Sequence, residues 1–186
     1  GSWDARRNYV LKKLYTNLTA LIAEAKDKNI STSLAVFKPK EILDLIIEPS
    51  EREWSKEKLA TLQQLSLFDS VNTEKPQVVR KLPYKFSYQF IDEEDRKSTL
   101  MIEDWEIGQL YWNCLSRHEG HDREAKACAD VRKKYIDDHA KTKDVHFFLG
   151  TSQQFHFVGH NPFMIIGTFY PKFPIAKKVE QQLKLF

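Results

Sequence analysis

Two short peptides in this chain have the residue types of a docking peptide. The first is Gln64-Leu65-Ser66-Leu67-Phe68, and the second, Gln182-Leu183-Lys184-Leu185-Phe186, forms the last five residues. The Gln amide offers two donors and an acceptor, which can anchor one end of the peptide. The Leu and Phe side chains fill an apolar cleft, and each contributes roughly 1.5–3 kcal/mol when fully buried. The middle position can then face solvent, which explains why it is Ser in one copy and Lys in the other.

This Gln-Leu-x-Leu-Phe pattern resembles the peptide by which bacterial polymerases and repair proteins dock on the sliding clamp. The resemblance implies that the partner-binding residues are Gln64, Leu65, Leu67 and Phe68, together with Gln182, Leu183, Leu185 and Phe186. Short motif matches carry false positives. The alternative is that the first copy ends a core helix and the second is a docked tail. The joint occurrence of two copies favours the docking interpretation of both.

Four aromatic side chains alternate along one predicted strand. Tyr84, Phe86, Tyr88 and Phe90 recur at every second position, so they share one face of the strand. Such a face can stack single-stranded bases, as OB-type sheets do. This interpretation assigns nucleic-acid binding to Tyr84, Phe86 and Tyr88, and the alternative is that the face lines a core.

Acidic residues flank Trp105. Glu103, Asp104 and Glu106 are carboxylates of the kind that a metal-dependent nuclease uses to bind Mg²⁺. They also stand at the start of a predicted helix, where acidic residues complement the helix dipole. The nuclease is therefore kept as an alternative.

Cysteine and histidine residues form two further groups. Cys114, His118, His121 and Cys128 carry the atoms of a tetrahedral zinc site. Their spacing matches no standard zinc pattern, so we expect no metal and no cofactor. His156 and His160, near Gln153 and Gln154, either line a ligand pocket or are surface histidines, and the second interpretation is favoured.

Composition is typical of a globular protein. The 186 residues suffice for one domain or two small ones, and the net charge of +3 permits nucleic-acid contact without arguing for it. No apolar run is long enough to cross a bilayer and no signal peptide is visible, which predicts no membrane partner. Two cysteines make no disulfide framework, so a cytoplasmic location is expected. The opening Gly1-Ser2 resembles a protease-cleavage scar, which leaves open an activity upstream.

Hydrophobic periodicity predicts the elements that position these residues. An amphipathic helix is expected over 4–28, a short helix from Ser55 to Gln63, and a central helix pair over 104–115 and 123–139. Strands are expected at 33–37, 42–47, 84–90, 98–102, 145–149, 155–158 and 163–169, with a turn at 92–95. Because helices and strands lack a clean β-α-β rhythm, we predict an α+β fold with a mixed or antiparallel sheet, with an OB-like barrel as the alternative arrangement.

The same pass along the chain predicts its domains. Residues 1–70 hold the N-terminal helix, strands and first pentapeptide, and the polar stretch 71–77 is a linker. Residues 78–170 form the α+β core domain, and 171–186 are a tail that carries the second pentapeptide.

A second resemblance concerns the body of the chain. The string from Ile102 to Tyr111, followed by Phe147-Phe148-Leu149-Gly150 and Asn161-Pro162-Phe163, is similar to uncharacterised prokaryotic proteins described as carrying dual OB-type domains. That resemblance implies nucleic-acid handling, in a mobile-element or defence setting.

Together these observations predict a non-enzymatic, DNA-binding accessory protein of bacterial DNA replication, repair or antiviral defence. Its partner is expected to be the sliding clamp, and weak binding of single-stranded nucleic acid is expected in addition. The alternatives are a metal-dependent nuclease acting on DNA or RNA and a structural interaction domain.

Overall fold

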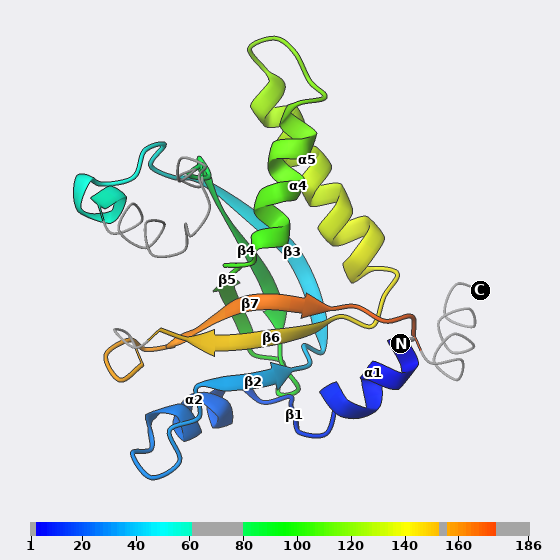
Figure 1. Cartoon of the computed structure of the whole chain (residues 1–186). Coiled ribbons are helices and arrows are strands. Elements are labelled where there is room, and N and C mark those ends of the chain that lie inside the picture. The colour runs from blue at the N-terminus through cyan, green and yellow to red at the C-terminus, as the bar shows by residue number, and fades with distance from the viewer. Residues whose placement is uncertain (1–2, 61–79, 153–155, 174–186) are drawn as a thin grey trace, which may run out of the picture. The chain divides into compact units, whose positions relative to one another are not determined.

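The computed structural model describes residues 3–60, 80–152 and 156–173. The chain divides into two compact units, one made of residues 1–46 with 86–186 and the other of residues 47–85. In chain order the elements are α1 (Trp3–Val10), β1 (Leu14–Tyr15), α2 (Leu18–Lys26), β2 (Leu34–Phe37), β3 (Glu41–Pro49), β4 (Tyr84–Ile91), β5 (Lys97–Met101), α4 (Trp105–Leu115), α5 (Arg123–Arg132), the π-helix η1 (Lys133–Ala140), β6 (His146–Thr151) and β7 (Phe163–Phe169) (Figure 1).

The first sheet joins strands from the two ends of the chain. Its order is β1-β2-β6-β7, with β1 parallel to β2 and the other pairs antiparallel. Strand β2 pairs with β6 so that Leu34 faces Gly150 and Phe37 faces Phe147. The β6–β7 register shifts between Phe148 and Leu149. The pairing brings the α2–β2 loop next to the end of β6, a contact that no local sequence signal specifies.

The second sheet has the order β3-β4-β5. The turn between β4 and β5 is built on Asp92, whose carboxylate accepts hydrogen bonds from the backbone N–H groups of Glu94 and Arg96, both at 3.0 Å. Asp95 adopts a positive φ of 61°, which Asp tolerates better than most residues. The predicted turn at 92–95 is thus confirmed, with its physical cause in the Asp92 side chain.

Aromatic side chains from both sheets meet in one core. The ring of Phe90 lies 5.6 Å from that of Phe37 and 5.3 Å from that of Phe147, measured between centroids. Tyr88 stacks on Phe147 at 5.4 Å, and its hydroxyl donates to the Tyr135 carbonyl at 2.9 Å. Such contacts add to the free energy gained by burying the rings.

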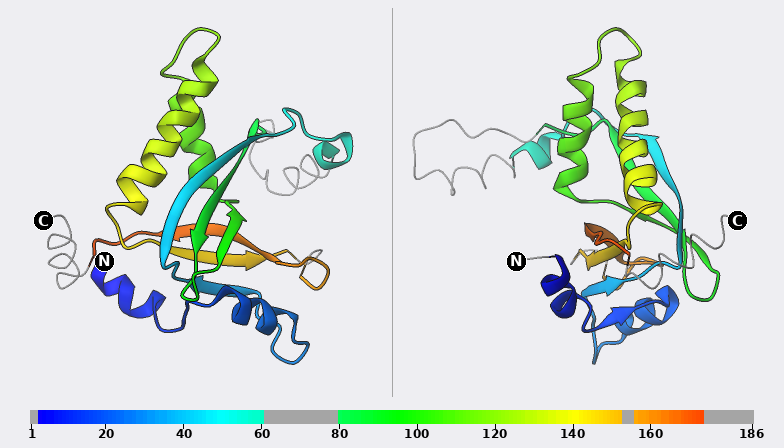
Figure 2. Two further views of the ribbon diagram at one scale, coloured as in Figure 1. Left: turned by 180° about the vertical axis from the view of Figure 1, so that it is seen from behind. Right: turned by 90° about the vertical axis from the view of Figure 1, so that its right-hand side faces the viewer.

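The central helices form a hairpin in which α4 and α5 lie side by side (Figure 2). Asp104 begins α4 by accepting a hydrogen bond from the Glu106 N–H at 3.0 Å, as an N-cap residue does. The predicted helix pair is confirmed. Its second member continues from α5 as a π-helix over Lys133–Ala140, which the sequence did not indicate.

Two predicted elements are wrong. The single helix over 4–28 is two helices, α1 and α2, separated by β1. Asn17 ends the extended segment, because its side chain accepts from the Ala20 N–H at 2.9 Å and so starts α2 anew. The predicted strand at 155–158 is also not formed, since residues 156–158 lie in a turn.

The fold class is confirmed as α+β with mixed and antiparallel sheets. The strands of the described residues form two sheets and no closed barrel, so the OB-like barrel is not the arrangement they adopt. None of the described helices is long and apolar enough to cross a membrane.

Candidate functional site

The two pentapeptides, residues 64–68 and 182–186, lie outside the described residues, as does the predicted linker 71–77. The structure does describe the points from which the chain departs toward each of them. The first copy belongs to the long connection between β3 and β4. The second follows β7, whose succeeding residues still contact the body of the protein through the Asp144 N–H, which donates to the Pro171 carbonyl at 2.8 Å.

The connection that carries the first pentapeptide is closed at its base. The Ser50 N–H donates to the Pro83 carbonyl at 2.8 Å, which joins its first and last residues. The ammonium of Lys81 lies 3.0 Å from the Glu51 carboxylate, thirty positions away in sequence. Lys81 also donates to the Glu53 carbonyl at 2.7 Å and lies 5.4 Å from the ring centroid of Trp54. The chain therefore leaves β3 and returns to β4 at neighbouring points.

The aromatic face of β4 is a core and not a stacking platform. Phe86 is 2% exposed, and Tyr88 and Phe90 have no exposed surface. Phe86 packs against Tyr111 at 6.1 Å, and Tyr84 is half-buried. The nucleic-acid-binding role predicted for Phe86 and Tyr88 is wrong for a physical reason: a ring without exposed surface has no face on which a base can stack.

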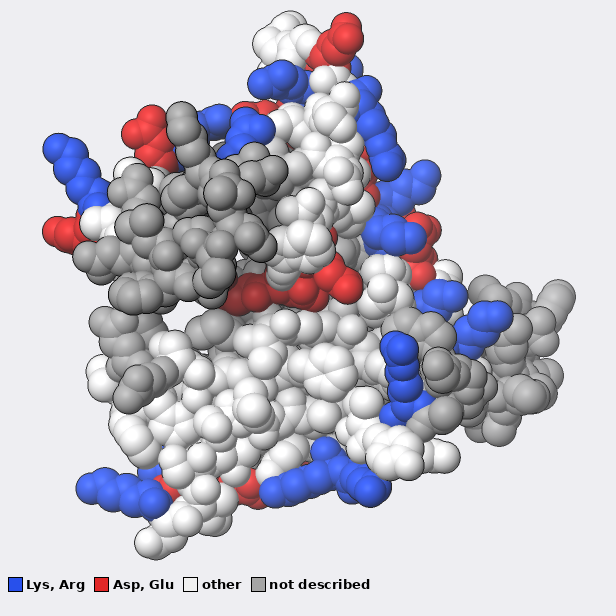
Figure 3. Space-filling view, in the orientation of Figure 1, with Lys and Arg blue, Asp and Glu red and all other residues white. Residues whose placement is uncertain are grey.

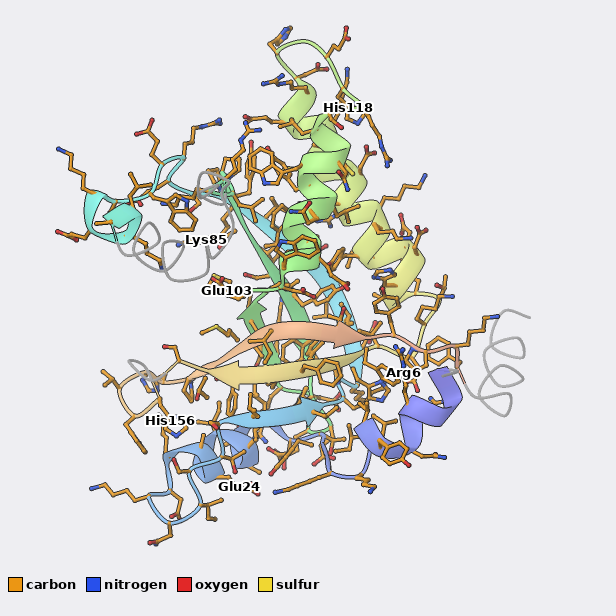
Figure 4. The ribbon with its side chains drawn as sticks, viewed as in Figure 1. Arg6, Glu24, Lys85, Glu103, His118 and His156 are labelled. Atoms are coloured by element: carbon orange, nitrogen blue, oxygen red, sulfur yellow. The ribbon has the colours of Figure 1, made fainter. Side chains whose placement is uncertain are left out.

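One of the carboxylates around Trp105 serves the start of α4. Asp104 is the N-cap of α4, and the Glu103 N–H donates to the Ile165 carbonyl at 2.8 Å. Figure 4 places Glu103 next to the beginning of α4. Within the described ranges, no three His, Cys, Asp or Glu side chains are grouped so that they could hold a metal ion. The nuclease alternative therefore gains no metal-binding geometry from this part of the chain.

The Cys and His residues of the helix pair, which the structure describes in full, are not grouped as metal ligands. His118, which lies near the end of the helical hairpin (Figure 4), is 2.7 Å from the Asp130 carboxylate across that hairpin. Cys114 is buried, and burial raises the pKa of its thiol. Burial likewise raises the pKa of Cys128 to about 11, so both thiols stay protonated at neutral pH.

A pocket in the first unit brings together polar side chains that the sequence keeps far apart. It has a volume of about 360 Å³ and is lined by Ser31, Ser33, Thr151, His156 and Phe157. The His156 imidazole is the centre of the group. Its Nε2 lies 3.1 Å from the Ser31 hydroxyl, and its Nδ1 lies 2.7 Å from the Thr151 hydroxyl. Both ring nitrogens of one buried imidazole are thus occupied by hydroxyl groups from two different segments.

Ser31 is held in place by the turn that follows α2. The N–H groups of Ile30 and Ser31 both donate to the Asp27 carbonyl, at 3.2 and 2.7 Å. The Thr32 hydroxyl donates to the Glu24 carboxylate at 3.2 Å, which ties the same turn back to the helix. Ser31 has a positive φ of 48°, an uncommon conformation for a residue with a Cβ. The turn therefore fixes the direction of the Ser31 side chain.

The opposite wall of the pocket comes from the end of β6. The Thr151 N–H donates to the Ser33 carbonyl at 3.0 Å, so the first sheet aligns the two walls. Figure 4 shows His156 beside the start of β2, and its ring lies nearly perpendicular to that of Phe157, with the two centroids 4.5 Å apart. Phe157 is itself 56% exposed. The result is a buried imidazole, His156, next to two exposed residues, Ser31 and Phe157.

Charged side chains are unevenly distributed over the described surface. In the view of Figure 3, the face over β6 and β7 shows few Lys, Arg, Asp or Glu residues, whereas the helical hairpin carries both signs. A phosphate-binding surface needs clustered Lys and Arg. This face of the described residues therefore does not have the charge pattern of a nucleic-acid interface.

Of the hydrogen-bonded group Ser31, His156 and Thr151, the sequence indicates only His156. The sequence leaves a pocket role open for His156 but favours a surface position; the structure buries His156, whereas His160 is exposed. Ser31 and Thr151 carry no local signal of a site. Ser31 and His156 are 125 positions apart, and only the β2–β6 pairing brings them together.

Comparison with protein families identifies a match over most of the chain. The sequence profile of a family described as a domain of unknown function, DUF8757, matches residues 15–186. No curated protein and no solved structure matches this chain significantly.

Proposed function

The chain belongs to the DUF8757 family of unknown function, and we propose from its own residues that it is an accessory protein of bacterial DNA replication, repair or defence that binds the sliding clamp. The binding elements in this proposal are residues 64–68 and 182–186. Each supplies one Gln anchor and a Leu-Phe pair that fills an apolar pocket of the partner.

The observation that carries the proposal is the repetition of the motif. Gln, Leu, Leu and Phe recur at the same four positions in both peptides, while the middle residue changes from Ser66 to Lys184. The middle residue, which is expected to face solvent, varies between the two copies. The four residues expected to contact the partner are identical. This is the pattern of a peptide that binds a fixed groove. Both peptides lie within the residues that the family profile matches.

The arrangement of the described residues supports a docking role for the first copy. The contacts of Lys81 with Glu51 and Glu53 close the base of the connection. The end of β3 and the start of β4 are therefore held together by residues outside the pentapeptide. Surface connections of this kind tolerate long insertions at a small entropic cost, and they commonly carry binding residues.

Two peptides on one chain change the expected affinity. A linear peptide binds modestly because it gives up conformational entropy when it becomes ordered. A bacterial clamp is a ring with one docking pocket per subunit, so it can engage two peptides of one molecule. We expect the second contact to strengthen the complex by about 10²-fold through effective concentration.

Surface-capture binding of the intact chain to a purified bacterial clamp tests the proposal. Replacing Leu67 and Phe68 with Ala removes the apolar side chains of the first copy, and replacing Leu185 and Phe186 does so for the second. Either double variant should weaken capture by about 10²-fold, and the variant that combines all four changes should abolish it.

Matched controls exist at the middle positions of the two peptides. Ser66→Ala and Lys184→Ala leave the four contact positions intact, so clamp capture should stay within about threefold of the unchanged protein. Absence of binding at high micromolar concentration, or equal loss in the control variants, would show that the pentapeptides are not clamp ligands.

A further inference from the structure

We propose that Ser31, His156 and Thr151 form a serine acyl-transfer site that acts on esters with an apolar acyl group. Ser31 is the nucleophile, His156 is its general base, and Thr151 is a positioning residue. The site contains none of the pentapeptide residues, so it is distinct from the proposed clamp ligands, and it lies in the pocket between the α2–β2 turn and the end of β6.

The hydrogen bonds supply the first argument. A neutral imidazole has one donor and one acceptor nitrogen, and the partner of one nitrogen selects the tautomer. When Nδ1–H donates to the Thr151 hydroxyl at 2.7 Å, Nε2 is left to accept from the Ser31 hydroxyl at 3.1 Å. That is the arrangement of a nucleophile, its base and a group that orients the base. Both distances are within the reach of a general base in the absence of substrate.

The backbone of Ser31 supplies the second. Its φ of 48° costs free energy for a residue that has a Cβ. Glycine would adopt this conformation more easily, so the serine side chain must contribute something else at this position. The Ser31 hydroxyl lies 3.1 Å from His156 Nε2, while the residue itself is exposed.

The reaction balances with water as the only co-reactant. The Ser31 Oγ attacks the ester carbonyl carbon as its proton passes to His156 Nε2, and the carbonyl electron pair moves onto oxygen. When that pair returns, the C–O bond to the alcohol breaks, and the alcohol leaves with the proton from Nε2. Water then attacks acyl-Ser31, again losing a proton to Nε2. The acid leaves as Ser31 recovers its proton, so ester and water become acid and alcohol.

The surroundings of the pocket define the class of acyl group. Phe157 lines it, and the neighbouring Val158 is 82% exposed. An uncharged acyl chain therefore fits this pocket better than a charged one, because it can pack against the exposed Phe157 ring.

We expect a slow enzyme. A Thr hydroxyl is neutral, so it stabilises an imidazolium less than the carboxylate of a Ser-His-Asp triad does. The N–H groups of Ser31 and Thr151 already donate to the carbonyls of Asp27 and Ser33, so they are not available to stabilise an oxyanion. A covalent probe that reports one attack per molecule is therefore a sharper test than turnover.

The test is labelling of the intact chain by an alkyl fluorophosphonate, followed by mass spectrometry of the modified peptide. We expect one adduct per chain, on Ser31. Ser31→Gly removes the hydroxyl and suits the positive φ, so it should abolish labelling without loss of thermal stability. His156→Gln should slow labelling by at least about 10²-fold, the contribution of a general base.

Two further variants separate a catalytic role from a structural one. Ser116→Ala is the control, because Ser116 is an exposed serine outside this pocket, and labelling of Ser31 should continue at the same rate. Thr151→Val should slow labelling by about tenfold, and Thr151→Ser, which restores the hydroxyl, should recover it. No adduct on the folded protein, an adduct that survives Ser31→Gly, or no recovery in Thr151→Ser would overturn the proposal, and the three side chains would then only join two loops.

Discussion

Replacing His139 tests how far burial controls the acid stability of the helical hairpin. His139 is 9% exposed, and its ring stacks on Tyr170 with centroids 4.2 Å apart. Burial is the main cause that lowers the pKa of His139 from 6.5 to about 4, assisted by the positive charges of Lys134 and Lys143 against the opposing charge of Asp138. The folded protein therefore holds this imidazole neutral at pH values where the unfolded chain protonates it.

The sign and size of the effect follow from linkage. Because the folded pKa lies below the unfolded one, the full stability is present above pH 6.5 and is lost as pH falls from 6.5 to about 4. Each pH unit in that window is worth about 1.4 kcal/mol, so the loss approaches about 3 kcal/mol. His139→Phe keeps a ring against Tyr170 but cannot be protonated, so its free energy of unfolding should not show this loss.

Urea unfolding of both proteins at several pH values between 7 and 4 measures the difference. Other groups titrate in the same range, but they are common to both proteins and cancel when the two curves are subtracted. His121→Gln is the control, since it removes an exposed histidine. If the difference between His139→Phe and the unchanged protein varies by less than about 1 kcal/mol over this range, burial does not control the charge of His139.

Two further changes examine the core and its buried charges. Phe86→Ala should lower the free energy of unfolding by about 3–5 kcal/mol, because it removes a ring that is 2% exposed. A variant that stays stable but binds single-stranded nucleic acid more weakly would instead show that Phe86 stacks on bases. Asp144→Asn should cost about 2 kcal/mol at pH 7, since Lys38 and Arg7 lose their shared carboxylate. Burial raises the pKa of Asp144, but the hydrogen bond and charge of Lys38 outweigh it, so the pKa is lowered and this cost should shrink as pH falls below 3.8. Asp138→Asn, which breaks an exposed pair, should cost less than about 0.5 kcal/mol, and an equal loss in both variants would contradict the reasoning.

Local sequence signals determined the elements whose causes are themselves local. Asp104 begins α4 through its own side chain, and Asp92 builds the β4–β5 turn with N–H groups two and four residues away. Strand β7 was predicted with its observed bounds from one apolar run. Asn17 is an equally local cap, and it marks the point at which the N-terminal helical pattern divides into two helices.

Tertiary packing decided which apolar faces are buried, because burial depends on what packs against each face. Alternation placed Phe86, Tyr88 and Phe90 on one face of β4, but it could not say whether that face meets water or Phe147. The stacking platform failed for this reason. Periodicity reports that a face is apolar, whereas burial depends on strands that arrive from elsewhere in the chain.

The two candidate binding features divide in the same way. Each pentapeptide is a pattern of five consecutive residues, so the sequence alone defines the clamp-binding proposal and the positions to mutate. The pocket of Ser31, Thr151 and His156 exists only because β2 pairs with β6, which brings together residues 125 positions apart. Contacts at such separation depend on the packing of the whole sheet, so no spacing along the chain can encode them, and the tertiary structure alone decided this site.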